Sequence, residues 1–216
     1  MYTFNLNKYN GLDMGLLSSS TSVTRYSVEG QLEEPILDSI AAGLKRHAIS
    51  EIDDHPSELG AGWTSFKNPY VPDFESSSFV IGTYLVFSLR VDKKSIPSKL
   101  VQKHFAGESA RRLKETGRDF LSANEKKMIK DHVVNMLNLK MPSTPHVYDV
   151  VWRYEQGEVW FFSNLKSANE QLETLFAKSF RVQLMRRIPY TMASLSADIS
   201  PAERDTLSQL APAGHE

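Results

Sequence analysis

The chain has 216 residues and no cysteine, with 25 Lys and Arg against 26 Asp and Glu. The lack of cysteine excludes disulfides, thiolate metal sites and cysteine nucleophiles, and it suits a reducing cytoplasm. With 41% hydrophobic and 24% charged residues, the composition excludes a disordered chain and predicts a folded one. No signal-peptide pattern and no apolar run of membrane-spanning length is found, so we expect a cytoplasmic protein without a membrane partner.

The first half of the chain predicts a strand, a helix and two further strands. Residues 1–20 are rich in Asn, Gly and Ser, which predicts a peripheral segment. β-Branched and aromatic residues predict a strand over 22–28, and apolar residues at helical spacing predict a helix from about residue 34. A short strand is expected at 62–66. The run 79–91 predicts the strongest strand, largely covered on both faces.

Two helices rich in Lys and Arg follow. The first is expected to begin near Pro97 and to end at Gly117, because glycine readily takes the left-handed conformation that closes a helix. The segment from Ser122 to Glu125 matches a capping box, in which the two side chains bond to free backbone amides at the start of a helix. It therefore opens the second basic helix.

The last part predicts a β-hairpin, a helix and a strand. The hairpin covers 147–154 and 159–163, and a second capping box at Ser167–Glu170 is expected to open the helix. A strand is expected near 182–188, followed by a tail with one weak helix after Ser200.

The order of elements is β-α-β-β, two basic helices, then β-β-α-β. This order predicts an α+β fold with a mainly antiparallel sheet and helices packed on it. We expect a peripheral segment at 1–20, one domain at 21–190 and a C-terminal tail at 191–216.

The near-neutral total hides a basic segment. Between residues 90 and 140 there are thirteen Lys and Arg but six Asp and Glu. Such segregation predicts a polyanionic partner, and a solvated face without a partner is the alternative. Because no base-reading motif is present, DNA binding should be independent of sequence. The predicted DNA-binding residues are Lys93, Lys94, Lys99, Lys103, Arg111, Arg112, Lys114, Arg118, Lys126, Lys127 and Lys130.

Catalytic chemistry is the competing interpretation. A metal-dependent nuclease needs carboxylates that converge on metal ions. The histidines lack metal-ligand spacing and no glycine-rich phosphate loop is present, so we predict no enzyme activity, metal or cofactor. The three tryptophans fall in predicted strands, which favours the core over base stacking. The carboxylates considered for a nuclease are Asp53, Asp54, Asp149, Glu155 and Glu158.

Three patterns together resemble the RdgC family of bacterial recombination-associated proteins. They are Gly62-Trp63 after the first helix, the strand 84–90 leading into Ile96-Pro97, and the basic helical pair that ends in the strand 148–152. The likeness covers most of residues 20–190. It implies a protein that binds duplex DNA without sequence preference, forms a ring-like dimer with a basic inner surface, and restrains RecA-promoted strand exchange.

This chain is shorter than the long members of that family, which have a further C-terminal region. A closed ring needs contacts at two ends of each subunit, so an open dimer is an alternative. We therefore expect a nucleoid-associated homodimer that modulates recombination or replication by occupying duplex DNA, with RecA as a second partner. A metal-dependent exonuclease and a protein-interaction module with a basic docking face are the alternatives.

Overall fold

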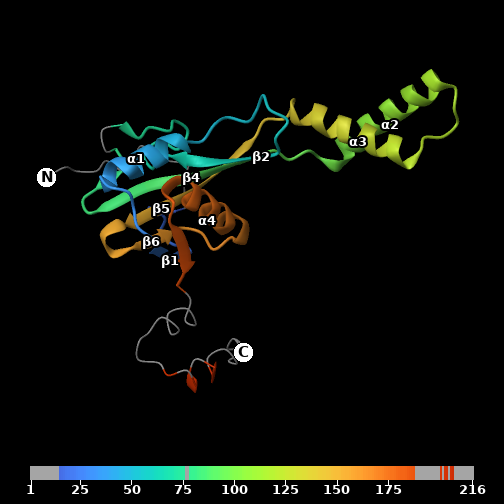
Figure 1. Ribbon diagram of the computed structural model, residues 1–216. Helices are drawn as coiled ribbons and strands as arrows, with labels where there is room; N and C mark the ends of the chain where they lie inside the picture. The colour runs from blue at the N-terminus through green and yellow to red at the C-terminus, as the bar shows by residue number, and fades with distance from the viewer. Residues whose placement is uncertain (1–14, 76–77, 188–199, 201, 204, 207–216) are drawn as a thin grey trace.

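The computed structural model describes residues 15–75, 78–187, 200, 202–203 and 205–206. Within these residues the chain forms four α-helices and a seven-stranded antiparallel sheet (Figure 1), which confirms the predicted α+β class and, apart from one additional short strand, the predicted element order. The strands are β1 (Thr24–Glu29), β2 (Leu59–Thr64), β3 (Val80–Ile81), β4 (Tyr84–Lys93), β5 (Thr144–Arg153), β6 (Glu158–Phe161) and β7 (Gln183–Arg186). The helices are α1 (Ile36–Arg46), α2 (Ser98–Thr116), α3 (Ala123–Asn138) and α4 (Lys166–Phe180), with a 3₁₀ turn at Tyr154–Gln156.

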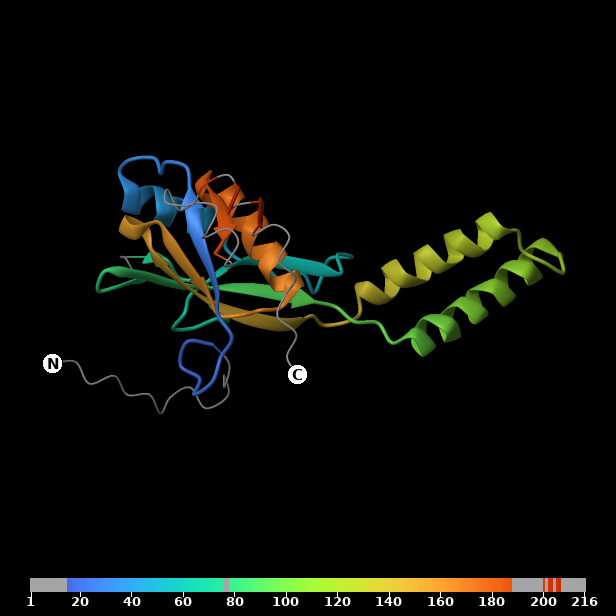
Figure 2. The same cartoon turned by 90° about the horizontal axis from the view of Figure 1, so that it is seen from below.

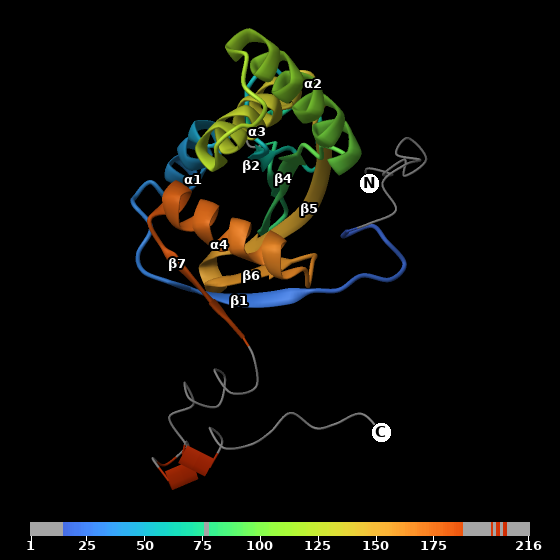
Figure 3. The ribbon, with the colours of Figure 1, turned by 90° about the vertical axis from the view of Figure 1, so that its right-hand side faces the viewer.

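The strand order is β2-β4-β5-β6-β1-β7, and β3 pairs with β4 beside this path. β1 lies between β6 and β7, so the sheet joins the two ends of the described chain. The sheet curls around α4 (Figure 3), and α1 packs on the same side. Every strand pair is antiparallel, as expected from the sequence.

The core lies between this side of the sheet and the helices. Alternate residues of β4, such as Phe87 and Leu89, point into it. Trp63 from β2 is fully buried, with its ring centroid 5.1 Å from that of Phe87. Its indole N–H donates to the Ser179 hydroxyl at 2.7 Å, so its polar atom is satisfied. Trp152 is also buried, which confirms the prediction for both side chains.

The opposite side of the sheet, which we call the outer face, is polar. Figure 2 shows α1 and α4 on the other side of the sheet from it. The remaining residues of β4, including Ser88, Arg90 and Asp92, alternate with the core residues and therefore point here. Asp149 on β5 lies directly opposite Ser88. The outer face thus carries buried polar and charged side chains.

The predicted single strand over 79–91 is wrong in one respect. Its first residues form β3, and the chain turns at Gly82 and Thr83 before β4 begins. Ile81 pairs with Tyr84 across this two-residue turn. Gly82 has a φ of 63°, which glycine adopts without steric cost, so the apolar run folds into a hairpin.

The predicted capping box at Ser167–Glu170 is also wrong. α4 begins two residues earlier than the box requires, with Leu165 at the cap position, so Ser167 lies inside the first turn. Ser163 and Asn169 bind the Leu165 backbone instead, at 3.2 Å to its N–H and 2.8 Å to its carbonyl. The side chains that organise this helix start are therefore outside the expected motif.

The predictions for the two ends are tested only in part. Residues 15–20 form turns and bends, in agreement with a peripheral segment, while 1–14 lie outside the described residues. The predicted last strand is found as β7, and its expected end at Ile188 is not described. The four described residues between 202 and 206 are helical, in agreement with the weak helix expected there.

Candidate nucleic-acid interface

Helices α2 and α3 form an antiparallel pair that projects beyond one end of the sheet (Figures 1 and 2). We call residues 98–138 the helical arm. It leaves the sheet where β4 ends at Lys93 and returns where β5 begins at Thr144. The basic segment of the sequence therefore forms an extended protrusion with solvent on most of its sides.

Local signals define the arm. α2 ends at Gly117, whose φ of 63° is the left-handed conformation predicted for it. α3 begins with the predicted capping box: the Ser122 hydroxyl accepts from the Glu125 N–H, and the Glu125 carboxylate accepts from the Ser122 N–H. Val133 and Leu137 of α3 are buried, while α2 has no fully buried residue. The arm thus has a narrow apolar seam and a large exposed surface.

Ten of the eleven predicted DNA-binding residues are exposed. The α2 lysines share one side of their helix, since Lys99 and Lys103 are one turn apart and Lys114 lies about 60° around the axis from Lys99. Small residues lie between them on this side, so a ligand can approach closely. The exposed residues are Lys93, Lys99, Lys103, Arg111, Arg112, Lys114, Arg118, Lys126, Lys127 and Lys130.

Two of these cations already have anionic partners. Arg111 contacts Glu108 at 2.6 Å and Glu115 at 3.8 Å. Arg118 pairs with Glu125 and, together with the bonds from Ser122, lowers the pKa of that carboxyl to about 2. Among the residues that the structure describes, no acidic side chain lies within ion-pair distance of the other eight. These eight are the strongest candidates for phosphate contacts.

Lys94 corrects the prediction. Its side chain is buried, and its ammonium donates to the backbone carbonyls of Asp53, His55 and Asn138 at 2.9, 2.7 and 2.6 Å. All three donors of an ammonium group are thereby used. Alternation along the strand points Lys93 to solvent and Lys94 to the outer face, so Lys94 fixes the base of the arm and has no ammonium donor left for another partner.

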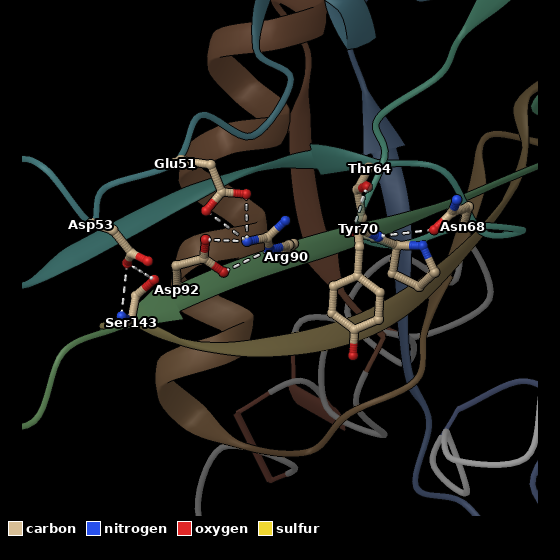
Figure 4. A network of polar contacts seen from close by, with 9 residues as sticks. Glu51, Asp53, Thr64, Asn68, Tyr70, Arg90, Asp92 and Ser143 are labelled. Atoms are coloured by element: carbon tan, nitrogen blue, oxygen red, sulfur yellow. Dashed lines mark hydrogen bonds and ion pairs between the residues drawn. The ribbon is translucent and has the colours of Figure 1, made fainter. Parts of the chain in front are cut away.

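A second group of polar contacts surrounds Arg90 on the outer face (Figure 4). The buried Arg90 guanidinium bonds to Asp92 at 2.7 Å and to Glu51 at 3.0 Å, with the Tyr70 ring 5.9 Å away. Burial alone would lower the pKa of Arg90, but these two carboxylates outweigh burial and raise it. The buried charges are therefore paired, as the energetics of charge burial require.

The segment that leads from the arm into β5 is attached to the loop that precedes β2. The Asp53 carboxylate accepts from the Ser143 backbone N–H at 2.8 Å and from its hydroxyl at 2.6 Å (Figure 4). These bonds lower the pKa of Asp53. Asp53 lies in a turn of this loop. Together with Lys94, this contact holds both connections of the arm against the loop that precedes β2.

The carboxylates considered for a nuclease have separate positions and partners. Asp53 binds Ser143, while Asp149 accepts from the Leu16 N–H and the Ser88 hydroxyl, both at 2.8 Å. Burial raises the pKa of Asp149. Glu158 on β6 is bound by arginines. In the described part of the chain, no group of three or more His, Cys, Asp or Glu is arranged to hold a metal ion.

The sequence interpretation missed a cluster on the outer face. Three arginines, Arg25, Arg153 and Arg187, surround Glu158, and Trp160 lies beside them. Trp160 is half-buried on the outer face, so the core prediction fits it less well than the other tryptophans. Strand alternation was the available signal, because Arg25, Arg153 and Trp160 each neighbour a core residue along their strands.

Comparison with known proteins adds no identity. No protein-family model matches the chain, and no curated protein has significant similarity to it. Among the described residues, no helix has the length and apolar character needed to cross a membrane.

Proposed function

We propose that this protein binds duplex DNA without sequence preference, and that the helical arm is the binding surface. The observation that carries the proposal is the set of exposed arm cations that form no ion pair with a described residue. Cations held at a surface neutralise phosphates and release counterions from DNA. The sequence contains no base-reading motif, and contacts to phosphates carry no sequence information, so the binding is independent of sequence.

The shape of the arm supports the same function. A projecting helical pair, anchored at its base by Lys94, can lie along a duplex. The resemblance to the RdgC family supplies the biological setting: DNA that is covered by this protein is less available to RecA. The protein then modulates recombination or replication in the nucleoid by occupancy.

A homodimer belongs to the same proposal. At the far end of the arm, Phe120 is 75% exposed and Met128 is 71% exposed. Exposed apolar side chains at the end of a protrusion support a contact with a second copy of the chain. Two arms that meet there would present their lysines to one duplex. Sedimentation of wild type and of Phe120→Ser tests this, and we expect dissociation of the dimer in the variant.

Reversal of charge on one side of α2 tests the arm. The variant K99E/K103E/K114E changes three exposed lysines, and K45E/K166E/K178E makes the same charge change on α1 and α4. Both are measured by fluorescence anisotropy with a random duplex over a salt series. We expect the arm variant to lower the slope of log K against log salt by about 3, and the control to leave it nearly unchanged.

The same titrations separate the alternatives. DNA that is shortened after incubation with Mg²⁺ would favour the nuclease. Equal affinity of a folded arm variant and wild type would contradict the proposal. Negligible binding by wild type at low salt would favour an acidic protein as the partner of the basic face.

A further inference from the structure

The arginine cluster on the outer face is built by strand register. Glu158 of β6 lies directly opposite Arg153 of β5, and Trp160 lies opposite Arg25 of β1. Arg187 directly follows β7, and its backbone N–H donates to the Arg25 carbonyl at 2.8 Å. Three adjacent strands and the end of a fourth thus bring these side chains to one place, although they are distant in sequence.

All three guanidinium groups bind the same carboxylate. Arg153 reaches Glu158 at 3.1 Å and Arg187 reaches it at 2.6 Å, while Arg25 bonds to it through both Nε and Nη2. Burial raises the pKa of Glu158, but Arg25 and Arg187 outweigh burial and lower it. Glu158 therefore stays ionised and holds the arginines together on the outer face.

The cluster has more donors than Glu158 can use. The Glu158 side chain is 6% exposed, whereas that of Arg25 is 55% exposed and that of Arg153 is 33% exposed. Arg25 and Arg153 offer about ten N–H donors, and a carboxylate has about four acceptor positions. These two arginines make three hydrogen bonds to Glu158 within the described residues. Exposed donors therefore remain for a second anion.

The neighbouring aromatic ring orients one of these donors. The Arg153 guanidinium lies 5.9 Å from the centroid of the Trp160 ring. A guanidinium fixed by a carboxylate and an aromatic ring loses little freedom when it binds a further oxygen anion. Phosphate is the anion that matches such a set of planar donors.

We propose that Arg25, Arg153 and Arg187 form a second phosphate-binding site, which holds a backbone phosphate of the same DNA that the arm binds. This inference rests on the proposed function. The competing explanation is that the cluster only joins strands β5, β6 and β1 through ion pairs. The two explanations differ in what happens when DNA length is varied.

The length of the DNA duplex is informative because the arm and the arginine cluster are far apart. From Thr144 at the base of the arm to Arg153, β5 advances nine residues, or about 30 Å at about 3.4 Å per residue. A duplex advances about 3.4 Å per base pair, so about 9 base pairs cover this distance. A duplex of about 8 base pairs can therefore contact the arm but cannot bridge both sites, while one of about 30 base pairs can.

The experiment compares R25Q/R153Q with R46Q/R181Q, which removes two exposed arginines on the helix-covered side. Affinity of the full chain is measured with random duplexes of both lengths over a salt series. On the long duplex, we expect R25Q/R153Q to lower the salt slope by about 2 and the control to have little effect. On the short duplex, the cluster variant should match wild type.

A second variant, which is expected to strengthen DNA binding, keeps the inference testable if R25Q/R153Q does not fold. Glu158→Gln removes the anion that occupies the arginines but keeps an oxygen acceptor, so binding of the long duplex should become stronger. Unchanged affinity of folded R25Q/R153Q at both lengths, or weaker binding by folded E158Q, would overturn the inference.

Inorganic phosphate separates this inference from the proposed function. Its binding to wild type, R25Q/R153Q and the arm variant K99E/K103E/K114E is followed by NMR titration. Loss of phosphate binding in the cluster variant alone, together with weaker binding of the long duplex by both variants, supports the site on DNA. Loss of phosphate binding in the cluster variant without any effect on DNA would overturn the assignment of the phosphate to nucleic acid. An arm variant that binds duplex normally would contradict the proposed function while leaving the cluster measurable.

Discussion

The helical arm and the sheet are stabilised in different ways. In the sheet, large apolar side chains such as Trp63 and Phe87 are completely buried, and charged residues on its outer face are paired. In the arm, α2 has no buried residue, and a left-handed glycine and a capping box define the helix ends. Charged residues on the arm can therefore change with little effect on stability, whereas the paired charges of the sheet contribute to its structure.

Two consecutive lysines at the end of β4 show this difference between exposed and structural charge. Lys93 is exposed at the end of β4, while Lys94 is buried against three carbonyl oxygens. They are chemically identical, and only strand alternation distinguishes them. The same kind of substitution should therefore change the free energy of unfolding by different amounts in the sheet and in the arm.

The largest effect is expected in the sheet core. Trp63→Ala removes a fully buried side chain and its bond to Ser179, and should lower the free energy of unfolding by about 3–5 kcal/mol. Gln102→Ala on the arm truncates an exposed side chain to which no contact is assigned, and should change this free energy by less than about 0.5 kcal/mol. Urea denaturation of both variants measures the contrast. Similar losses would mean that arm and sheet share one core.

The base of the arm should be the next most sensitive place. Lys94→Met leaves three carbonyl oxygens without their donor, which should cost about 1–3 kcal/mol. Lys93→Met is the matched control and should be nearly neutral. Urea denaturation gives the cost, and hydrogen exchange should show faster exchange near Asn138 in the first variant only. Equal behaviour of the two variants would contradict the role given to Lys94.

Asp149 makes the outer face sensitive to pH. Burial raises its pKa in the folded protein above the unfolded value of about 3.9. The folded state therefore favours the protonated acid, and this contribution to stability is lost as pH rises through the folded pKa. Relative to wild type, Asp149→Asn should gain stability as pH rises from about 3 to about 7. Denaturation at several pH values tests this, and a constant difference between the proteins would refute it.

Glu125 should make the far end of the arm sensitive to acid, with the opposite sign and the smallest effect. Its folded pKa of about 2 lies below the unfolded value of about 4.3. Its contribution is present above the unfolded pKa and is lost as pH falls toward about 2. The protection factors of amides in the first turn of α3, which correct for the intrinsic pH dependence of hydrogen exchange, should fall over this range in wild type. In Glu125→Gln, protection should already be low and should vary less with pH.

The sequence predicted most elements of the fold because strong local signals define them. Gly117 and the Ser122–Glu125 box mark the ends of the arm helices, and both signals act within a few residues of chain. The failures come where distant contacts decide the structure. Ser167 matches a capping pattern, but Asn169 and Ser163 organise that helix start through the loop after β6.

The candidate sites were predictable to different degrees. The basic helices are contiguous in sequence, so counting charges was enough to find them. Lys94 could have been recognised by continuing the alternation of β4 by one residue. The arginine cluster requires the register of β1, β5 and β6, which no local pattern supplies, since Arg25 and Glu158 become neighbours only in the folded sheet.

The central claim is that duplex DNA covers the arm. Lysine acetylation of the wild-type protein, read by mass spectrometry with and without a random duplex, tests it most directly. We predict that DNA protects Lys99, Lys103 and Lys114, that Lys166 and Lys178 stay reactive, and that the buried Lys94 reacts in neither state. If bound DNA left the arm lysines as reactive as in the free protein, the account would be contradicted.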